Sequence, residues 1–151
     1  MRVGVIGARG RMGATVCEAV AADPELALVA AVDPSATAGD AVAGVRLAAV
    51  LGALAEAEAD VVVDFTTAPA ARVNLSQVAG WGMHAVVGTT GLLAEDLDGL
   101  RAAFSASNCL VAPNFAIGAV LMMRFAELAA PFFASAEVIE LHHDQKVDAP
   151  S

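Results

Sequence analysis

Short, nearly continuous apolar runs alternate along residues 1–113 with stretches in which apolar residues recur at helical spacing. Such runs are typical of parallel strands covered on both faces, and their alternation with helices predicts right-handed βαβ units. We therefore expect an α/β fold with a doubly wound parallel sheet, and a loop at residues 34–44. The predicted strands are residues 2–6, 26–32, 60–65, 84–88 and 109–113, and the predicted helices are residues 11–23, 47–58, 69–82 and 94–107.

The pattern changes after the fifth predicted strand. A long apolar stretch carries Arg124 and Glu127 three positions apart and predicts a buried amphipathic helix that ends near Pro131. Alternating polar and apolar residues over 135–142 then predict a half-exposed strand, which would begin an α+β domain. We expect residues 1–116 to be one domain, 117–134 a connecting helix and 135–151 the incomplete start of a second domain.

Composition narrows the class of protein. The net charge of −9 argues against a nucleic-acid surface or an anionic membrane as partner. No apolar run reaches the roughly 18 uncharged residues that a membrane span needs, and the chain begins directly with a strand pattern, so we expect no signal peptide and a cytoplasmic protein. Cys17 and Cys109 have no metal-binding spacing and are expected to be core thiols. We predict no metal site.

Three glycines mark the junction of the first strand and the first helix. In "VGVIGARGRMG", Gly7 permits a tight turn, Gly10 permits a pyrophosphate to approach the backbone, and Gly13 lets the helix pack closely on the strand. Asp33 lies twenty residues past Gly13 at the end of the second strand, where a carboxylate accepts hydrogen bonds from ribose hydroxyls. This variant of the dinucleotide fingerprint predicts a Rossmann-like fold, although a plain turn with a capping aspartate is the alternative.

The two arginines of this turn bear on the choice of cofactor. Arg9 and Arg11 would favour the 2′-phosphate of NADPH, whereas Asp33 would repel it, so we expect either NADH or NADPH to be used. Further candidates follow the third, fourth and fifth strands in "DFTTAP", "VVGTTG" and "VAPNFAIG" and would surround one crevice. The predicted cofactor-binding residues are Gly7, Ala8, Arg9, Gly10, Arg11, Met12, Asp33, Gly88, Thr89, Thr90, Ala112, Pro113, Asn114 and Phe115.

Titratable residues gather in the last twelve positions, "ELHHDQKVDAPS". Taken alone, the two histidines and the lysine fit solvent-exposed residues at the end of a strand. Together, "VGVIGARGRMG", "DVVVDFTTAP", "HAVVGTTG", "APNFAIGAVLMM" and "VIELHHDQKVDAPS" resemble the 4-hydroxy-tetrahydrodipicolinate reductases, with an acid-ended second strand similar to the actinobacterial members. The resemblance implies NAD(P)H-dependent reduction of a small dicarboxylic cyclic imine in diaminopimelate and lysine biosynthesis.

The same resemblance implies residue roles. His142 would donate a proton to the reduced ring, Lys146 would be a second proton donor, and His143 would hold substrate carboxylates. In this family "DAPS" continues into Gly-Thr, the rest of a substrate domain and the contacts of a homotetramer. We therefore expect residues 1–151 to be a fragment with little turnover. The alternatives are another Rossmann dehydrogenase of amino-acid metabolism, acting on homoserine or aspartate, and a non-catalytic dinucleotide-binding module.

Overall fold

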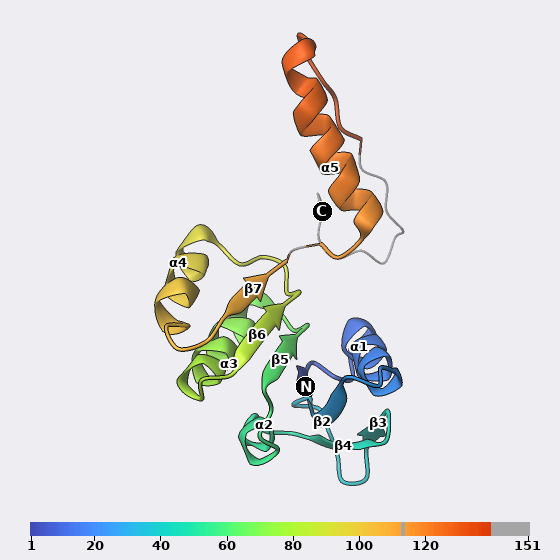
Figure 1. Ribbon diagram of the computed structural model, residues 1–151, viewed down its shortest axis with the longest axis vertical. Coiled ribbons are helices and arrows are strands. Elements are labelled where there is room, and N and C mark those ends of the chain that lie inside the picture. Colours follow the sequence, from blue (N-terminus) through green and yellow to red (C-terminus); the bar gives the residue numbers. More distant parts are fainter. Residues whose placement is uncertain (113, 140–151) are drawn as a thin grey trace. The chain divides into compact units, whose positions relative to one another are not determined.

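The computed structural model describes residues 1–112 and 114–139. Residues 1–113 form one compact unit and residues 114–151 another, and each is considered by itself. The first unit contains a seven-stranded sheet of order β3-β4-β2-β1-β5-β6-β7 (Figure 1), in which every neighbouring pair except β3 with β4 is parallel. The strands are β1 (Arg2–Ile6), β2 (Ala27–Val32), β3 (Ala41–Val42), β4 (Val45–Ala48), β5 (Val61–Asp64), β6 (His84–Val87) and β7 (Cys109–Val111).

Four helices pack with the sheet in the first unit, and the described part of the second unit contains one α-helix and one short 3₁₀ helix. The five strands and three of the four helices predicted for residues 1–113 are confirmed. The helices are α1 (Arg11–Ala22), α2 (Gly52–Glu56), α3 (Ala68–Gly80), α4 (Ala94–Ala103), α5 (Ile117–Ala129) and the short 3₁₀ helix η1 (Ala130–Phe132).

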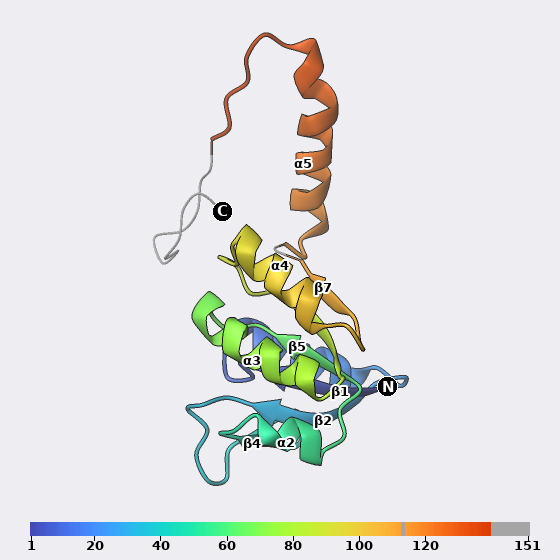
Figure 2. The ribbon, with the colours of Figure 1, turned by 90° about the vertical axis from the view of Figure 1, so that its left-hand side faces the viewer.

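Helices cover both faces of the sheet. On one face α2, α3 and α4 bury a cluster that includes Leu54, Leu75 and Leu100, and all three helices lie on the side that faces the viewer in Figure 2. On the other face α1 packs Cys17 and Val20 against the sheet. Burial raises the pKa of Cys17 to about 11, so this thiol is neutral near neutral pH, as expected for a core residue.

The region between β2 and β5 differs from the prediction. Residues 34–44 were expected to form a loop and residues 47–58 a helix, whereas the chain forms the β3–β4 hairpin and the short helix α2. The prediction was wrong because β4 pairs in parallel with β2, aligning Leu47 with Ala31, and this pairing outweighs the helix preference of an alanine-rich stretch. The sheet therefore extends two strands beyond β2.

The second unit also differs from the prediction. Helix α5 has no buried residue, and Ile117, Phe125 and Leu128 are each more than 60% exposed. The expected burial requires a second apolar layer, and the described part of this unit provides none. Residues 135–139 form no strand in the described chain, where no neighbouring strand is present to pair with them, and residues 140–142 lie outside it. None of the described helices is long and apolar enough to cross a membrane.

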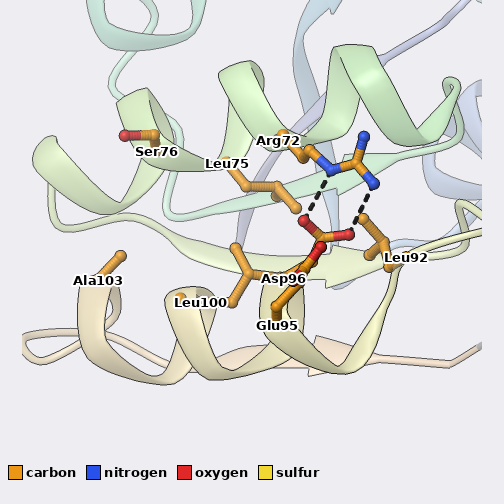
Figure 3. A pocket seen from close by; sticks show the side chains of 9 residues that line it. Arg72, Leu75, Ser76, Leu92, Glu95, Asp96, Leu100 and Ala103 are labelled. Carbon is orange, nitrogen blue, oxygen red and sulfur yellow. Dashed lines mark hydrogen bonds and ion pairs between the residues drawn. The ribbon is translucent and has the colours of Figure 1, made fainter.

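A charged pair joins α3 to α4 (Figure 3). Arg72 Nε and Nη2 donate to the two carboxylate oxygens of Asp96 at 2.7 and 2.8 Å, and Asp96 also accepts the backbone N–H of Leu93 at 2.8 Å. The side-chain hydrogen bond from Arg72 is the main reason that the pKa of Asp96 lies below its ordinary value. A cavity of about 300 Å³ lies beside the pair. Because Arg72 and Asp96, which line it, already pair with each other, we assign the pair a structural role.

Candidate functional site

The order of the strands indicates where a ligand site is expected in this sheet. β1 lies at the centre, and the chain continues from it to β2 on one side and later to β5 on the other. In open α/β sheets, ligands bind outside the carboxyl ends of the strands where the strand order reverses. In this fold, that point is the crevice above β1, between the ends of β2 and β5.

The predicted glycine turn forms the base of this crevice. Gly7 has φ +78°, a left-handed conformation that glycine adopts readily, and a Cβ atom there would lie 2.7 Å from the carbonyl oxygen of Phe65. Gly13 sits so close to the turn that a Cβ atom would lie 2.0 Å from the carbonyl oxygen of Gly7. The backbone N–H groups of Gly7 and Ala8 both donate to the carbonyl of Val32, which fixes the turn against β2.

Helix α1 begins inside the turn without a side-chain cap. Gly10 occupies the N-cap, and no acidic residue lies in the first turn of the helix. The first backbone N–H groups of a helix have no partner within the helix and carry the positive end of its dipole. This end of α1 is therefore suited to an anionic group such as a pyrophosphate.

Asp33 follows β2 directly and ties the end of this strand to the turn. Its Oδ2 accepts the backbone N–H of Arg9 at 3.1 Å, and its Oδ1 accepts the backbone N–H of Ser35 at 3.0 Å and the hydroxyl of Ser35 at 2.5 Å. Burial alone would raise its pKa and is the largest single influence, but these hydrogen bonds together lower the pKa below its ordinary value. Asp33 is therefore an ionised acceptor at the edge of the crevice.

Arg9 lies on the same side of the crevice as Asp33. Its Nη1 donates to the carbonyl of Ser35 at 2.7 Å and lies 3.3 Å from Oδ2 of Asp40. The guanidinium is about half exposed, so a second anion can reach it. Arg9 thus lies between two carboxylates, since its backbone N–H donates to Asp33 and its guanidinium pairs with Asp40.

A cleft of about 470 Å³ opens at this edge of the sheet. It contains Gly7, Gly10 and Asp33 from the prediction, together with residues that follow β4 and β5 and residues from α3. An apolar wall with a few polar groups is typical of a small-molecule site. The lining residues are Ile6, Gly7, Gly10, Val32, Asp33, Pro34, Ala49, Leu51, Phe65, Thr66, Thr67, Ala70 and Asn74.

The remaining predicted residues of the first unit lie at the same ends of neighbouring strands. Ala8 is buried behind the turn, whereas Arg11 and Met12 are exposed on the first turn of α1. Gly88, Thr89 and Thr90 follow β6, and Ala112 follows β7, where its N–H donates to the carbonyl of Val87.

Gly88 and Thr89 contact other residues of the protein, Gly88 by packing and Thr89 by a hydrogen bond. A Cβ atom on Gly88 would lie 2.1 Å from the ring of Phe65, so this glycine makes room for the ring. Thr89 is 3% exposed, and its hydroxyl donates to the carboxylate of Asp64. Thr90 is exposed.

Several predicted residues cannot be placed in the crevice. Asn114 and Phe115 belong to the second unit, where Oδ1 of Asn114 accepts the N–H of Ala116 just before α5. Pro113 and the expected catalytic and substrate-binding residues His142, His143 and Lys146 lie outside the described residues.

Seven cleft residues belong neither to the predicted cofactor-binding residues nor to "DFTTAP", and four of these seven also lie apart from the glycine turn and Asp33. Ala49 and Leu51 were hidden in a stretch interpreted as helix, although the end of β4 brings them to the same edge. Ala70 and Asn74 lie in the first part of α3, and no local pattern indicates a binding role for them beyond their position after "DFTT". Parallel strands place the segments that follow them at one edge of the sheet. Recognising residues 45–48 as a strand from the sequence would therefore have indicated Ala49 and Leu51.

These features define the class of protein as a Rossmann-type α/β protein with a dinucleotide fingerprint at the switch point of its sheet. The solved structure of GenD2 from gentamicin A biosynthesis, in complex with NAD, is similar in fold, with a TM-score of 0.69 and 29% identity over 86% of this chain and 39% of that chain.

The chain belongs to the dihydrodipicolinate reductase family. The model of the N-terminal part of that family matches residues 1–115, and the model of the C-terminal part matches residues 118–151. The 4-hydroxy-tetrahydrodipicolinate reductase of Nocardia farcinica is 53% identical, and that of Streptomyces coelicolor is 48% identical, each over the whole chain. The chain spans 57% and 56% of the lengths of these relatives.

A solved member of the family has the same architecture. The dihydrodipicolinate reductase of Paenisporosarcina sp. TG-14, with dipicolinate bound, aligns with a TM-score of 0.81 and 37% identity over all of this chain and 61% of that one.

Proposed function

We propose that this sequence is the cofactor-binding part of an NADH- or NADPH-dependent 4-hydroxy-tetrahydrodipicolinate reductase. The observation that carries the proposal is the glycine turn, which Asp33 and the end of β2 hold at the switch point of the sheet. Membership of the family and the dipicolinate bound to a similar reductase support the substrate class, a small dicarboxylate. The proposal includes a cytoplasmic location and a homotetrameric assembly. Light scattering on a chain of the relatives' full length tests the homotetramer.

The residues of the crevice fit a dinucleotide. The close approach of Gly7 and Gly13 leaves no room for side chains where a pyrophosphate would meet the N-terminus of α1. Asp33 would accept the hydroxyls of the adenosine ribose on the β2 side, and the nicotinamide half would then extend toward the ends of β5 and β6. When bound, the reduced nicotinamide would supply the hydride.

The reduction also requires protons and a grip on the substrate. We propose His142 as the main proton donor, Lys146 as a second donor and His143 as a contact of the substrate carboxylates. Their types suit this chemistry, because imidazole exchanges protons near neutral pH and cations bind carboxylates. The decisive experiment is to measure NADH oxidation dependent on 4-hydroxy-tetrahydrodipicolinate by a polypeptide of the relatives' full length that contains this sequence. NADH binding without substrate-dependent oxidation would contradict the proposal.

Asp33→Ala is expected to weaken the binding of NADH more than that of NADPH. The substitution removes a charged acceptor for the ribose, a loss of about 1.5–3 kcal/mol, and also removes a charge that repels the 2′-phosphate. It frees the Arg9 N–H as well, so some loss with both cofactors is expected. Fluorescence titration with each cofactor gives the ratio of dissociation constants. The control is Asp98→Ala, which removes an exposed carboxylate on α4. If Asp33→Ala leaves the ratio of the NADH and NADPH dissociation constants unchanged, Asp33 does not bind the ribose.

Replacing Arg9 and Arg11 together with alanine is expected to harm NADPH selectively. Each arginine that contacts a 2′-phosphate contributes a charge-assisted hydrogen bond of about 1.5–3 kcal/mol, so the dissociation constant of NADPH should rise at least about tenfold. NADH should be affected much less, because it lacks this phosphate. Arg101→Ala on α4 serves as the matched control. If both cofactors weaken equally, the two arginines do not read the 2′ position.

A further inference from the structure

A second carboxylate, Asp64, is buried behind the wall of the cleft. It is the last residue of β5 and is 0% exposed. Its Oδ1 accepts the backbone N–H of Thr66 at 2.9 Å, the hydroxyl of Thr66 at 2.6 Å and the hydroxyl of Thr89 at 2.9 Å. Its Oδ2 accepts Nδ2 of Asn74 at 3.0 Å. None of the arginines in the described part of the chain forms an ion pair with Asp64.

These hydrogen bonds join three segments that are distant in sequence. Thr66 belongs to the segment after β5, Thr89 to the segment after β6, and Asn74 to α3. The hydroxyl of Thr89 also accepts the backbone N–H of Thr66 at 3.0 Å, which closes the network. Because a buried carboxylate without a cation is costly unless its acceptor positions are filled, this network is stable only when all three segments are in place.

The network lies on the side of the crevice opposite Asp33. Thr66 and Asn74 line the cleft, and Phe65 between Asp64 and Thr66 places its ring against Gly88. β5 and β2 flank β1 on opposite sides, so an adenosine ribose at Asp33 directs the other half of a dinucleotide toward β5 and β6.

We propose that Asp64 is a positioning residue for the nicotinamide half of the cofactor. It acts through Thr66, Asn74 and Thr89, whose arrangement fixes the walls that this half contacts, and Asp64 itself touches no ligand. The inference rests on the proposed dinucleotide binding and adds the residue that organises one half of that site.

Asp64→Asn tests this assignment on the 151-residue chain. With its oxygen facing the threonine donors, the new amide would present N–H groups to Nδ2 of Asn74, so two donors would face each other. The dissociation constant of NADH is expected to rise about tenfold, and that of ADP-ribose, which lacks the nicotinamide, should stay within about twofold. The double variant Asp64→Asn with Asn74→Asp restores a donor facing an acceptor and should recover NADH binding.

Two further variants keep the test decisive. Thr89→Val removes a hydroxyl from the network at nearly constant volume. It should also weaken NADH while leaving ADP-ribose nearly unchanged, and it replaces Asp64→Asn as the test if that variant does not fold. Val78→Ala, a fully buried change on α3 outside the cleft, should lower the melting temperature without changing the ratio of the NADH and ADP-ribose constants.

The outcomes separate the two proposals. Normal NADH affinity in Asp64→Asn and Thr89→Val overturns the positioning role, and so does an equal weakening of NADH and ADP-ribose, which indicates a purely structural effect. A wild-type chain that binds neither ligand overturns the proposed function itself, and this inference with it.

Discussion

Gly13→Ala is expected to abolish most dinucleotide binding by this chain. The added methyl group would lie 2.0 Å from the carbonyl oxygen of Gly7 and 2.9 Å from the Cα atom of Ala8, and both contacts are with backbone that cannot rotate away. Helix α1 must therefore move from the turn and carry its N-terminal N–H groups with it. Losing two charge-assisted hydrogen bonds to the pyrophosphate, at about 1.5 kcal/mol each, corresponds to about 100-fold in the dissociation constant. Overpacking should also lower the free energy of unfolding by about 1–3 kcal/mol.

The matched control for this prediction is Gly99→Ala. Gly99 is also within a helix, but apart from the backbone of its own helix and its chain neighbours, no atom lies within 4 Å of an added Cβ. Alanine favours the helix there, so stability should rise slightly while NADH binding stays unchanged. Titration and thermal unfolding of both variants provide the comparison. Wild-type affinity in Gly13→Ala would mean that the close packing of α1 on the turn is not needed for binding.

His142→Ala, introduced into a polypeptide of the relatives' full length, is expected to lower kcat by about 10²–10⁴-fold. This is the usual contribution of a general acid, and the residue has no expected contact with the dinucleotide, so the dissociation constant of NADH should be unchanged. Lys146→Ala should also lower kcat, and His143→Ala should mainly raise KM for the dicarboxylate. Steady-state kinetics combined with NADH titration distinguish these effects.

His84→Ala is the histidine control for this series. His84 begins β6 at the opposite edge of the sheet, where its Nδ1 accepts the backbone N–H of Asn108 at 3.0 Å. Its removal should leave kcat within about twofold of the unmodified chain, since no group there takes part in proton transfer. A near-normal kcat in His142→Ala would show that the proton comes from another group.

Much of the sheet was predictable because its central strands are largely buried. β1 and β5 are nearly continuous runs of valine and isoleucine, and such runs have few stable alternatives to a central strand. The β3–β4 hairpin was missed because its strands have only two and four residues, and their pairing depends on β2. Local sequence cannot indicate a strand whose stability comes from a neighbour far along the chain.

The candidate site also contains a part that could be predicted from local sequence and a part that could not. The glycine turn and Asp33 were predictable because their spacing is fixed by one βαβ unit. The hydrogen-bond network of Asp64 was not predictable, although the segment that Asp64 begins was expected near the crevice, because its partners Asn74 and Thr89 lie on other elements. A buried network of this kind leaves no periodic pattern in the sequence, and only the folded chain brings its members together.

The central position of β1 has a consequence for the order in which the protein forms during synthesis. Of the described strands, β1 is synthesised first, and the chain between β1 and β4 contains the glycine turn, α1 and Asp33. The part of the crevice on the β2 side can therefore assemble while the rest is still being translated. The part on the β5 side requires β5, α3 and the segment after β6, so its buried carboxylate remains hydrated until Thr89 has emerged. The two halves of the cleft are therefore expected to form at different times on the nascent chain.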